Sequence, residues 1–220
     1  MSLAELYARH SLPPGSKTIR VLNIESVPEL TQNALDEPIR CTLCTVDLDL
    51  DDRPKFTALS YVWGVDPPTP QHFLFCGELR IPVTKNCESA LRHLRQTIDC
   101  LTIWVDAVCI NQADDAEKAL QIPLMGDIYS SADPVYVWLG EATPGTDRAL
   151  RYFNEGSLEK YFCPPRLNAA AWSLFLFPWS RVHCPVPLRG SRKPLVSTVN
   201  YTNFEDLKEV FLRPWIHRVW

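Results

Sequence analysis

The chain has 220 residues, of which 46% are hydrophobic and 22% are charged, so it can bury one sizeable core and is too apolar for a disordered protein. The formal net charge is -4, and no run of lysine or arginine is long enough to follow a phosphate backbone, so nucleic acid is not an expected partner. Eight cysteines are too few for a disulfide-stabilised scaffold of this length.

Residues 1–14 lack an apolar core of signal-peptide length, because Glu5 and Arg9 interrupt their apolar residues. The most apolar later segment, residues 169–178, has about ten residues, whereas a membrane helix needs roughly 20. We therefore expect a cytoplasmic protein with reduced thiols and no membrane partner. Residues 1–16 are expected to be a lead-in, and the folded domain is expected to begin at residue 17.

Two β-strands are predicted after the lead-in. Residues 18–24 are rich in β-branched side chains, and residues 39–50 alternate apolar and polar side chains until several aspartates end the pattern. Cys41 and Cys44 have the spacing of zinc ligands, but the sequence has no second close pair of cysteines. We therefore interpret them as structural thiols and predict no metal site.

The next elements are a buried strand, a hairpin and a helix. Residues 56–64 form a continuous apolar run that ends at a glycine, which is typical of a strand buried on both faces. Residues 72–83 predict a hairpin that turns at Gly77. Asn86 is expected to cap a helix whose core face, at helical spacing, consists of Cys87, Ala90, Leu91, Leu94 and Ile98.

Residues 101–110 predict a second buried strand with Asp106 near its carboxyl end, followed by a helix at residues 115–132 and a third strand at residues 134–140. This succession predicts an α/β fold with a mostly parallel sheet flanked by helices, to which the hairpin and the N-terminal strands are added. Sheets of this kind bind ligands beyond the carboxyl ends of their strands.

The pattern weakens after residue 145. Residues 146–154 and residues 204–212 predict amphipathic helices, and prolines interrupt much of the chain between them. We therefore expect a single domain at residues 17–220 with a divergent or inserted region at residues 145–203.

Three motifs occur in a fixed order along the chain: ALSYVWG at residues 58–64, WVDAVCINQ at residues 104–112 and VWLGE at residues 137–141. Together they resemble the motifs of the fungal heterokaryon-incompatibility (HET) domain. The resemblance covers residues 17–141 well and residues 145–203 poorly.

The resemblance implies a role in fungal non-self recognition, in which HET domains trigger programmed cell death after unlike cells fuse. HET domains are also distantly similar to Toll/interleukin-receptor (TIR) domains, which have a flavodoxin-like fold and some of which cleave NAD. The resemblance thus implies an NAD-like nucleotide as ligand or substrate, with no required cofactor. The late catalytic glutamate of that pattern would follow Trp220, so the domain is expected to be truncated at its carboxyl end.

Asp106 is the strongest candidate site residue, because a carboxylate near the end of an apolar strand must be paired or must face a crevice. The side-chain amides of Asn111 and Gln112, which follow Asp106, suit either the recognition of a ribose or the shaping of their own loop. Tyr61 and Trp63 can stack on a base, although one of the two rings is expected to pack in the core. The predicted ligand-binding residues are Ser60, Tyr61, Trp63, Gly64, Asp106, Cys109, Asn111 and Gln112.

Two acids are candidate catalytic residues. Glu117 lies on the core-facing side of its predicted helix, where it can act as a base or orient a substrate, but it also fits a capping pair with Asp114. Glu141 follows the third strand as a crevice-side acid or as a solvated loop residue. Cys109 is a nucleophile only if a base lies beside it, and no histidine spacing provides one.

Two functions remain open at this level. One is a TIR-like domain that binds NAD and hydrolyses its glycosidic bond with the help of a carboxylate. The other is a non-catalytic signalling module that acts by self-association or by docking a protein partner. In the second case the apolar residues 169–178 and 211–220 are the expected partner surface.

Overall fold

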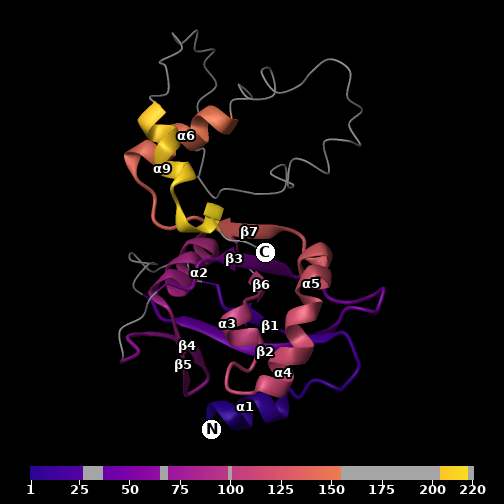
Figure 1. Cartoon of the computed structure of the whole chain (residues 1–220). Coiled ribbons are helices and arrows are strands. Elements are labelled where there is room, and N and C mark those ends of the chain that lie inside the picture. The colour runs from indigo at the N-terminus through magenta and orange to yellow at the C-terminus, as the bar shows by residue number, and fades with distance from the viewer. Residues whose placement is uncertain (27–36, 65–68, 99–100, 155–203, 218–220) are drawn as a thin grey trace, which may run out of the picture. The chain divides into compact units, whose positions relative to one another are not determined.

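The structure is a computed structural model that describes residues 1–26, 37–64, 69–98, 101–154 and 204–217 (Figure 1). Its first compact unit is Met1–Trp138, and its second contains the described residues from Leu139 onward. The strands, all in the first unit, are β1 (Thr18–Ile24), β2 (Ile39–Asp47), β3 (Thr57–Tyr61), β4 (His72–Cys76), β5 (Leu79–Val83), β6 (Leu101–Trp104) and β7 (Val135–Trp138). The helices of this unit are α1 (Leu3–Arg9), α2 (Lys85–Thr97), α3 (Asp106–Cys109), α4 (Asp115–Gln121), η1 (Ile122–Leu124) and α5 (Met125–Ser131).

The described strands form one seven-stranded sheet in the order β5-β4-β2-β1-β6-β3-β7. Strand β3 is parallel to both of its neighbours, β6 and β7. Strand β3 comes first in the chain and lies between the other two. The chain leaves β3 to form β6 on one side of it, and then crosses from β6 to form β7 on the other side. Helix α2 lies on one side of these strands, and α4 and α5 lie on the other (Figure 1).

The sheet is mixed, and the prediction of a mostly parallel sheet needs correction. Among the described strands, β1 is antiparallel to both β2 and β6, and β4 is antiparallel to β5. Strands β2 and β4 are parallel. Strand pairs that follow each other in the chain can pair antiparallel without a helical crossover, as β1–β2 and β4–β5 do. The N-terminal strands therefore lie inside the sheet and join its parallel part to the hairpin.

Several local predictions are confirmed. In β2 the side chains of Ile39, Cys41 and Leu43 are buried, whereas those of Arg40 and Thr42 are exposed. The β4–β5 hairpin turns at a glycine, Gly77, with a φ of 59°, a conformation that a side chain would strain.

Helix α2 buries the predicted core face from Cys87 to Leu94, and Ile98 is its partly buried C-cap. Its N-cap is Thr84 and not Asn86. The hydroxyl of Thr84 accepts a hydrogen bond from the backbone N–H of Cys87. A threonine oxygen at this position satisfies one of the free N–H groups of the first turn, so the helix begins one residue before Asn86.

Three other elements differ from the sequence prediction. Residues 3–9 form α1, whose Leu6 and Tyr7 pack in the core, so ordered structure begins before residue 17. Strand β6 ends at Trp104, and Asp106 begins the short helix α3, because the described pairing of β6 with β1 and β3 stops there. The helix predicted at residues 115–132 is divided at Pro123, which has no N–H to donate, into α4, η1 and α5.

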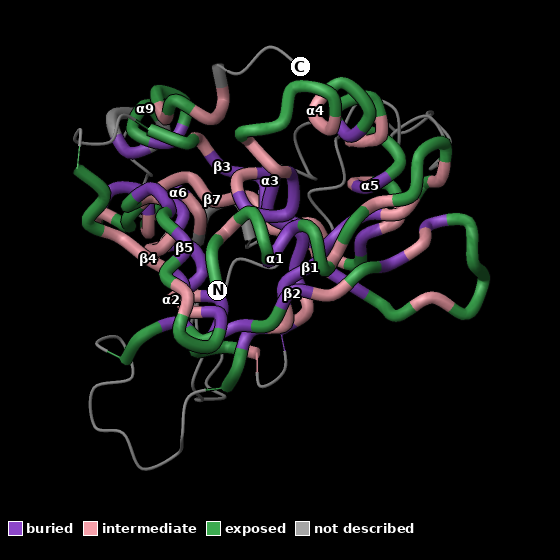
Figure 2. Tube along the Cα trace, turned by 90° about the horizontal axis from the view of Figure 1, so that it is seen from below, coloured by how far each residue is buried: buried purple, intermediate pink, exposed green. Residues whose placement is uncertain are grey.

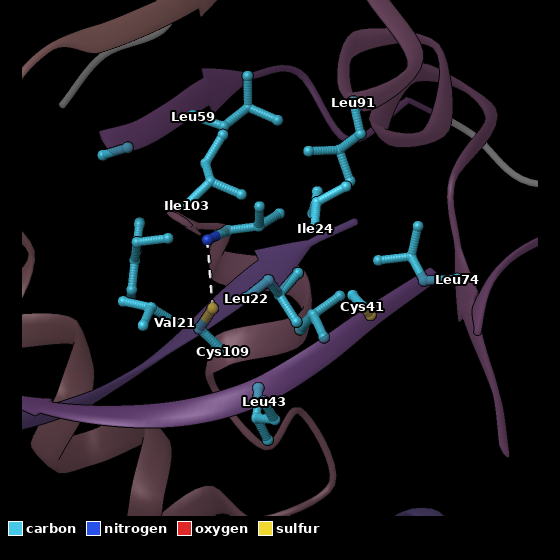
Figure 3. Packing of buried hydrophobic residues seen from close by; sticks show 14 of the residues in the cluster. Val21, Leu22, Ile24, Cys41, Leu43, Leu59, Leu74, Leu91, Ile103 and Cys109 are labelled. Atoms are coloured by element: carbon cyan, nitrogen blue, oxygen red, sulfur yellow. Dashed lines mark hydrogen bonds between the residues drawn. The ribbon is translucent and has the colours of Figure 1, made fainter. Parts of the chain in front are cut away.

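The core of the first unit lies between the sheet and its helices. Side chains from adjacent strands and from α2 interdigitate there, among them Leu22, Leu43, Leu74, Leu91 and Ile103 (Figure 3). The trace coloured by burial shows β1, β3 and α3 largely buried, while much of α1 and α4 is exposed (Figure 2).

The second unit contains α6 (Pro144–Asn154), α9 (Phe204–Phe211) and η3 (Pro214–His217), so both amphipathic helices predicted here are confirmed. The guanidinium of Arg148 donates two hydrogen bonds, of 2.8 and 2.6 Å, to the carboxylate of Asp206 and thereby joins α6 to α9. Phe211 and Leu212 are exposed. The apolar segment at residues 169–178 lies outside the described residues.

The packing of the sheet predicts the cost of a cavity. Leu22 is fully buried, so Leu22→Ala should lower the free energy of unfolding by about 2–5 kcal/mol. Leu50 is 53% exposed, and Leu50→Ala should change it by less than about 0.5 kcal/mol. Urea unfolding followed by circular dichroism measures both, and equal effects of the two substitutions would contradict the placement of Leu22.

Candidate functional site

The carboxylate of Asp106 lies just beyond the end of β6, at the first residue of α3. Its Oδ2 accepts a hydrogen bond of 2.9 Å from the indole Nε1 of Trp63, and its Oδ1 accepts one of 2.8 Å from the backbone N–H of Ala107. The residue is only 8% exposed. These donors offset the cost of burying a charge, and they also fix the direction in which the carboxylate points.

Tyr61, the last residue of β3, has its ring in the core and its hydroxyl close to the Asp106 carboxylate and the Cys87 thiol. Burial raises the pKa of Tyr61 far above its usual range, and the nearby Cys87 and Asp106 groups add to this effect. The phenol therefore stays protonated at any physiological pH, so its O–H serves this cluster as a hydrogen-bond donor.

Trp63 is the exposed aromatic residue of the site. Trp63 is 39% exposed, whereas Tyr61 is 1% exposed, which confirms the expectation that one of the two aromatic residues packs in the core. The bond to Asp106 holds the indole in one orientation, so a flat ligand group can stack on it without first ordering the ring. Gly64 follows with a φ of 82°, a backbone conformation in which most side chains are strained.

The amides after α3 shape the loop that borders Asp106. The side chain of Gln112 donates a hydrogen bond of 2.9 Å from its Nε2 to the backbone carbonyl of Asp106. The side-chain oxygen of Asn111 accepts from the backbone N–H of Ala113, within its own turn. The structure therefore brings Tyr61, Trp63, Asp106 and Gln112 together, and the side chain of Asn111 serves the loop.

Glu117 is held by Arg20 in a two-bond ion pair. The guanidinium Nη1 and Nη2 atoms donate to the two carboxylate oxygens over 2.6 and 2.9 Å, and the backbone N–H of Asn111 donates to Oε1 over 2.7 Å. Asp114 caps α4 as the sequence predicted, but the Glu117 side chain does not return to it. In this arrangement Glu117 positions the loop that carries the amides.

Arg20 was missed by the sequence analysis, although it organises this side of the first unit. It is 1% exposed, and it also donates to the backbone carbonyls of His10 and Cys109. Its guanidinium lies 4.8 Å from the ring centre of Tyr7, whose hydroxyl donates to the carbonyl of Val108. A lone arginine inside the apolar strand β1 was the available signal.

Two further predicted residues, Ser60 and Cys109, are buried in the first unit. Ser60 is buried in β3. Cys109 is fully buried, burial raises the pKa of its thiol, and the thiol accepts a hydrogen bond from the backbone N–H of Val105 (Figure 3). A protonated thiol without access to solvent is a poor nucleophile. Glu141 belongs to the second unit and is exposed, and its backbone carbonyl accepts from Arg213.

Within the described residues, no three or more His, Cys, Asp or Glu side chains gather in a way that could hold a metal ion. None of the described helices has the length and apolar character that crossing a membrane requires.

The fold and the site define an α/β protein with an aromatic and acidic cluster at the carboxyl ends of adjacent parallel strands. The sequence profile of heterokaryon incompatibility proteins (HET) matches residues 56–220, and the chain belongs to this family. Over 118 residues the chain is 38% identical to "Heterokaryon incompatibility protein 6, OR allele" of Neurospora crassa. The aligned segment covers 49% of this chain and 17% of that protein. No solved structure matches the chain.

The buried ion pair predicts that neutralising two acids of helix α4 will have very different effects on the free energy of unfolding. Glu117→Gln leaves the charge of Arg20 buried without its partner and should lower the free energy of unfolding by about 3–5 kcal/mol. The control is Asp115→Asn, because Asp115 is almost fully exposed and pairs with Lys118 at the surface, so no measurable change is expected. Urea unfolding of both variants tests this, and a small effect of Glu117→Gln would show that the pair is not structural.

The buried phenol of Tyr7 predicts a loss of stability at alkaline pH. Burial, followed by the nearby Cys109 thiol, raises the pKa of Tyr7 to about 12, whereas the unfolded chain ionises near the usual value of about 10. The contribution is therefore fully present below pH of about 10 and is lost as the pH rises through about 12. In denaturant titrations at several pH values, Tyr7→Phe should show a shallower decline over this window, and an unchanged slope would contradict the burial of the hydroxyl.

Proposed function

We propose that this chain carries the HET domain of a fungal non-self recognition protein and acts in the cytoplasm in signalling that leads to programmed cell death. Membership of the HET family and the likeness to a Neurospora crassa heterokaryon incompatibility protein support this proposal. The chain spans about a sixth of the length of that relative, so the activity of the whole relative is carried over as part of the proposal.

Within this role, we propose that the cluster around Trp63 and Asp106 binds an NAD-like nucleotide. The observation that carries the proposal is an exposed indole whose orientation is fixed by a nearly buried carboxylate. Both groups lie beyond the carboxyl ends of parallel strands, where α/β sheets bind ligands. The order β6-β3-β7 is also that of the first three strands of a flavodoxin-like sheet, which supports a TIR-like arrangement of this part.

The chemistry of the cluster suits a base attached to a ribose. The face of Trp63 offers stacking to an adenine or nicotinamide ring, and the amide of Gln112 is of the kind that recognises ribose hydroxyls. In hydrolysis the oxygen of a water molecule would bond to the ribose C1′ and lose a proton to the solvent. The bond from C1′ to nicotinamide would break, and nicotinamide would leave as a neutral molecule with the bonding electrons. The carboxylate of Asp106, beside the Trp63 indole, is the group that we propose to stabilise the positive charge on the ribose in that transition state.

A non-catalytic signalling module is the second candidate, and a specific observation favours it. Both oxygens of Asp106 already accept hydrogen bonds, and the charge of Glu117 is neutralised by Arg20. With these carboxylates engaged, the exposed ring of Trp63 would contact a protein partner or a second copy of the chain.

The nucleotide proposal predicts the effect of removing the ring. Trp63→Ala should weaken the binding of NAD, measured by calorimetry, by about tenfold or more, since stacking on one aromatic ring contributes about 1–3 kcal/mol. Leu120→Ala is the matched control, because Leu120 is a 58% exposed apolar side chain on α4, and it should bind NAD like the unaltered protein.

The same samples separate the two functions when nicotinamide release is followed by chromatography. Release that is lost in Asp106→Asn supports hydrolysis, whereas NAD binding without release supports a non-catalytic nucleotide sensor. If the unaltered protein shows no binding at millimolar NAD, the nucleotide proposal is wrong and the interaction module stands.

A further inference from the structure

The side-chain amide of Asn86 joins three separate elements of the first unit. Its Nδ2 donates a hydrogen bond of 2.6 Å to the backbone carbonyl of Val62, directly after β3. Its Oδ1 accepts one of 2.7 Å from the indole Nε1 of Trp138, the last residue of β7. Asn86 itself lies in the first turn of α2. One amide therefore uses a donor and an acceptor at once to connect the ends of two neighbouring strands.

These contacts lie where the ladder between β3 and β7 stops. Tyr61 and Trp138 are the final registered pair of these parallel strands. Val62 is thus the first residue beyond the ladder, and the Asn86 amide supplies a partner that β7 no longer provides. The ring of His93, about two helical turns further along α2, packs against Trp138 with ring centres 4.9 Å apart. The carboxyl ends of β3 and β7 are in this way tied to α2.

The bond to Val62 bears directly on Trp63, the next residue. When the carbonyl of Val62 is held, the peptide plane between Val62 and Trp63 is held too, and this plane sets the direction in which the Trp63 side chain leaves the backbone. The indole then reaches Asp106 across 43 positions of sequence. The two hydrogen bonds of Asn86 go to Val62 and Trp138, so its effect on Trp63 passes through the backbone of Val62.

We propose that Asn86 is a positioning residue of the Trp63 site, which fixes the backbone that presents the indole to Asp106 and to a bound nucleotide. The nucleotide in this statement rests on the proposed function, whereas the fixing of the indole does not. Only a side chain with both a donor and an acceptor can make the two bonds. Aspartate has nearly the same shape but no donor, and its charge would face the carbonyl of Val62.

The test compares Asn86→Asp with Thr84→Ala. The Thr84 hydroxyl caps α2 two residues before Asn86, so Thr84→Ala weakens the same helix end while both Asn86 bonds remain. The first readout is the indole N–H resonance of Trp63 in nitrogen-15 spectra, assigned with Trp63→Phe. The second is the dissociation constant of NAD. Should Asn86→Asp fail to fold, Asn86→Ser replaces it, since serine introduces no charge.

We expect Asn86→Asp to shift the Trp63 indole resonance and to raise the dissociation constant of NAD about tenfold, the change that loss of one well-formed hydrogen bond produces. Thr84→Ala should lower the urea midpoint and leave the resonance and the affinity unchanged. The proposal is overturned if the Trp63 resonance does not move in Asn86→Asp, or if Thr84→Ala moves it equally. If the unaltered protein binds no NAD, the proposed function fails, and the resonance still decides the role of Asn86.

Discussion

The guanidinium of Arg20 is a permanent positive charge in the interior of the first unit, and much of the site's geometry follows from how it is satisfied. A buried charge of this kind costs several kcal/mol unless a partner charge and further acceptors surround it. Glu117 supplies the charge, and the carbonyls of His10 and Cys109 supply the acceptors. Four hydrogen bonds thus bring together the end of α1, strand β1, the end of α3 and helix α4.

The consequence for the site is that its loop is held from both ends. The carbonyl of Cys109 and the backbone N–H of Asn111 are both bound within the Arg20–Glu117 pair. Gln112, next in the chain, then reaches back to the carbonyl of Asp106. The short helix α3 is fixed between these contacts, which holds the Asp106 carboxylate within hydrogen-bond distance of the Trp63 indole. Glu117, which the sequence suggested as a catalytic acid, therefore helps to position Asp106.

The sequence predicted best those elements whose patterns reflect local physics. Alternation marked β2, a glycine turn marked the hairpin, and the helical stripe from Cys87 to Leu94 marked α2. The sequence-based prediction failed where the deciding contact joins residues that are far apart in the chain. The end of β6 depends on its partner strands, and the role of Glu117 depends on an arginine 97 positions away. Of the site, Trp63 and Asp106 were found by their positions at the ends of apolar strands. Arg20 offered only its position inside the apolar strand β1 as a signal, and the role of Asn86 depends on contacts with residues that are distant in the chain.

The central claim is that the Trp63 and Asp106 cluster of this HET domain is a nucleotide-binding site. A crystal structure of the protein grown with NAD tests it most directly, because the position of a bound ring needs no further interpretation. The account predicts a base or nicotinamide ring stacked on the Trp63 indole, beside Gln112, with the bond between Trp63 and Asp106 intact. The account would be contradicted if the nucleotide bound elsewhere on the molecule while a protein neighbour covered the face of Trp63, both in the crystal and in solution.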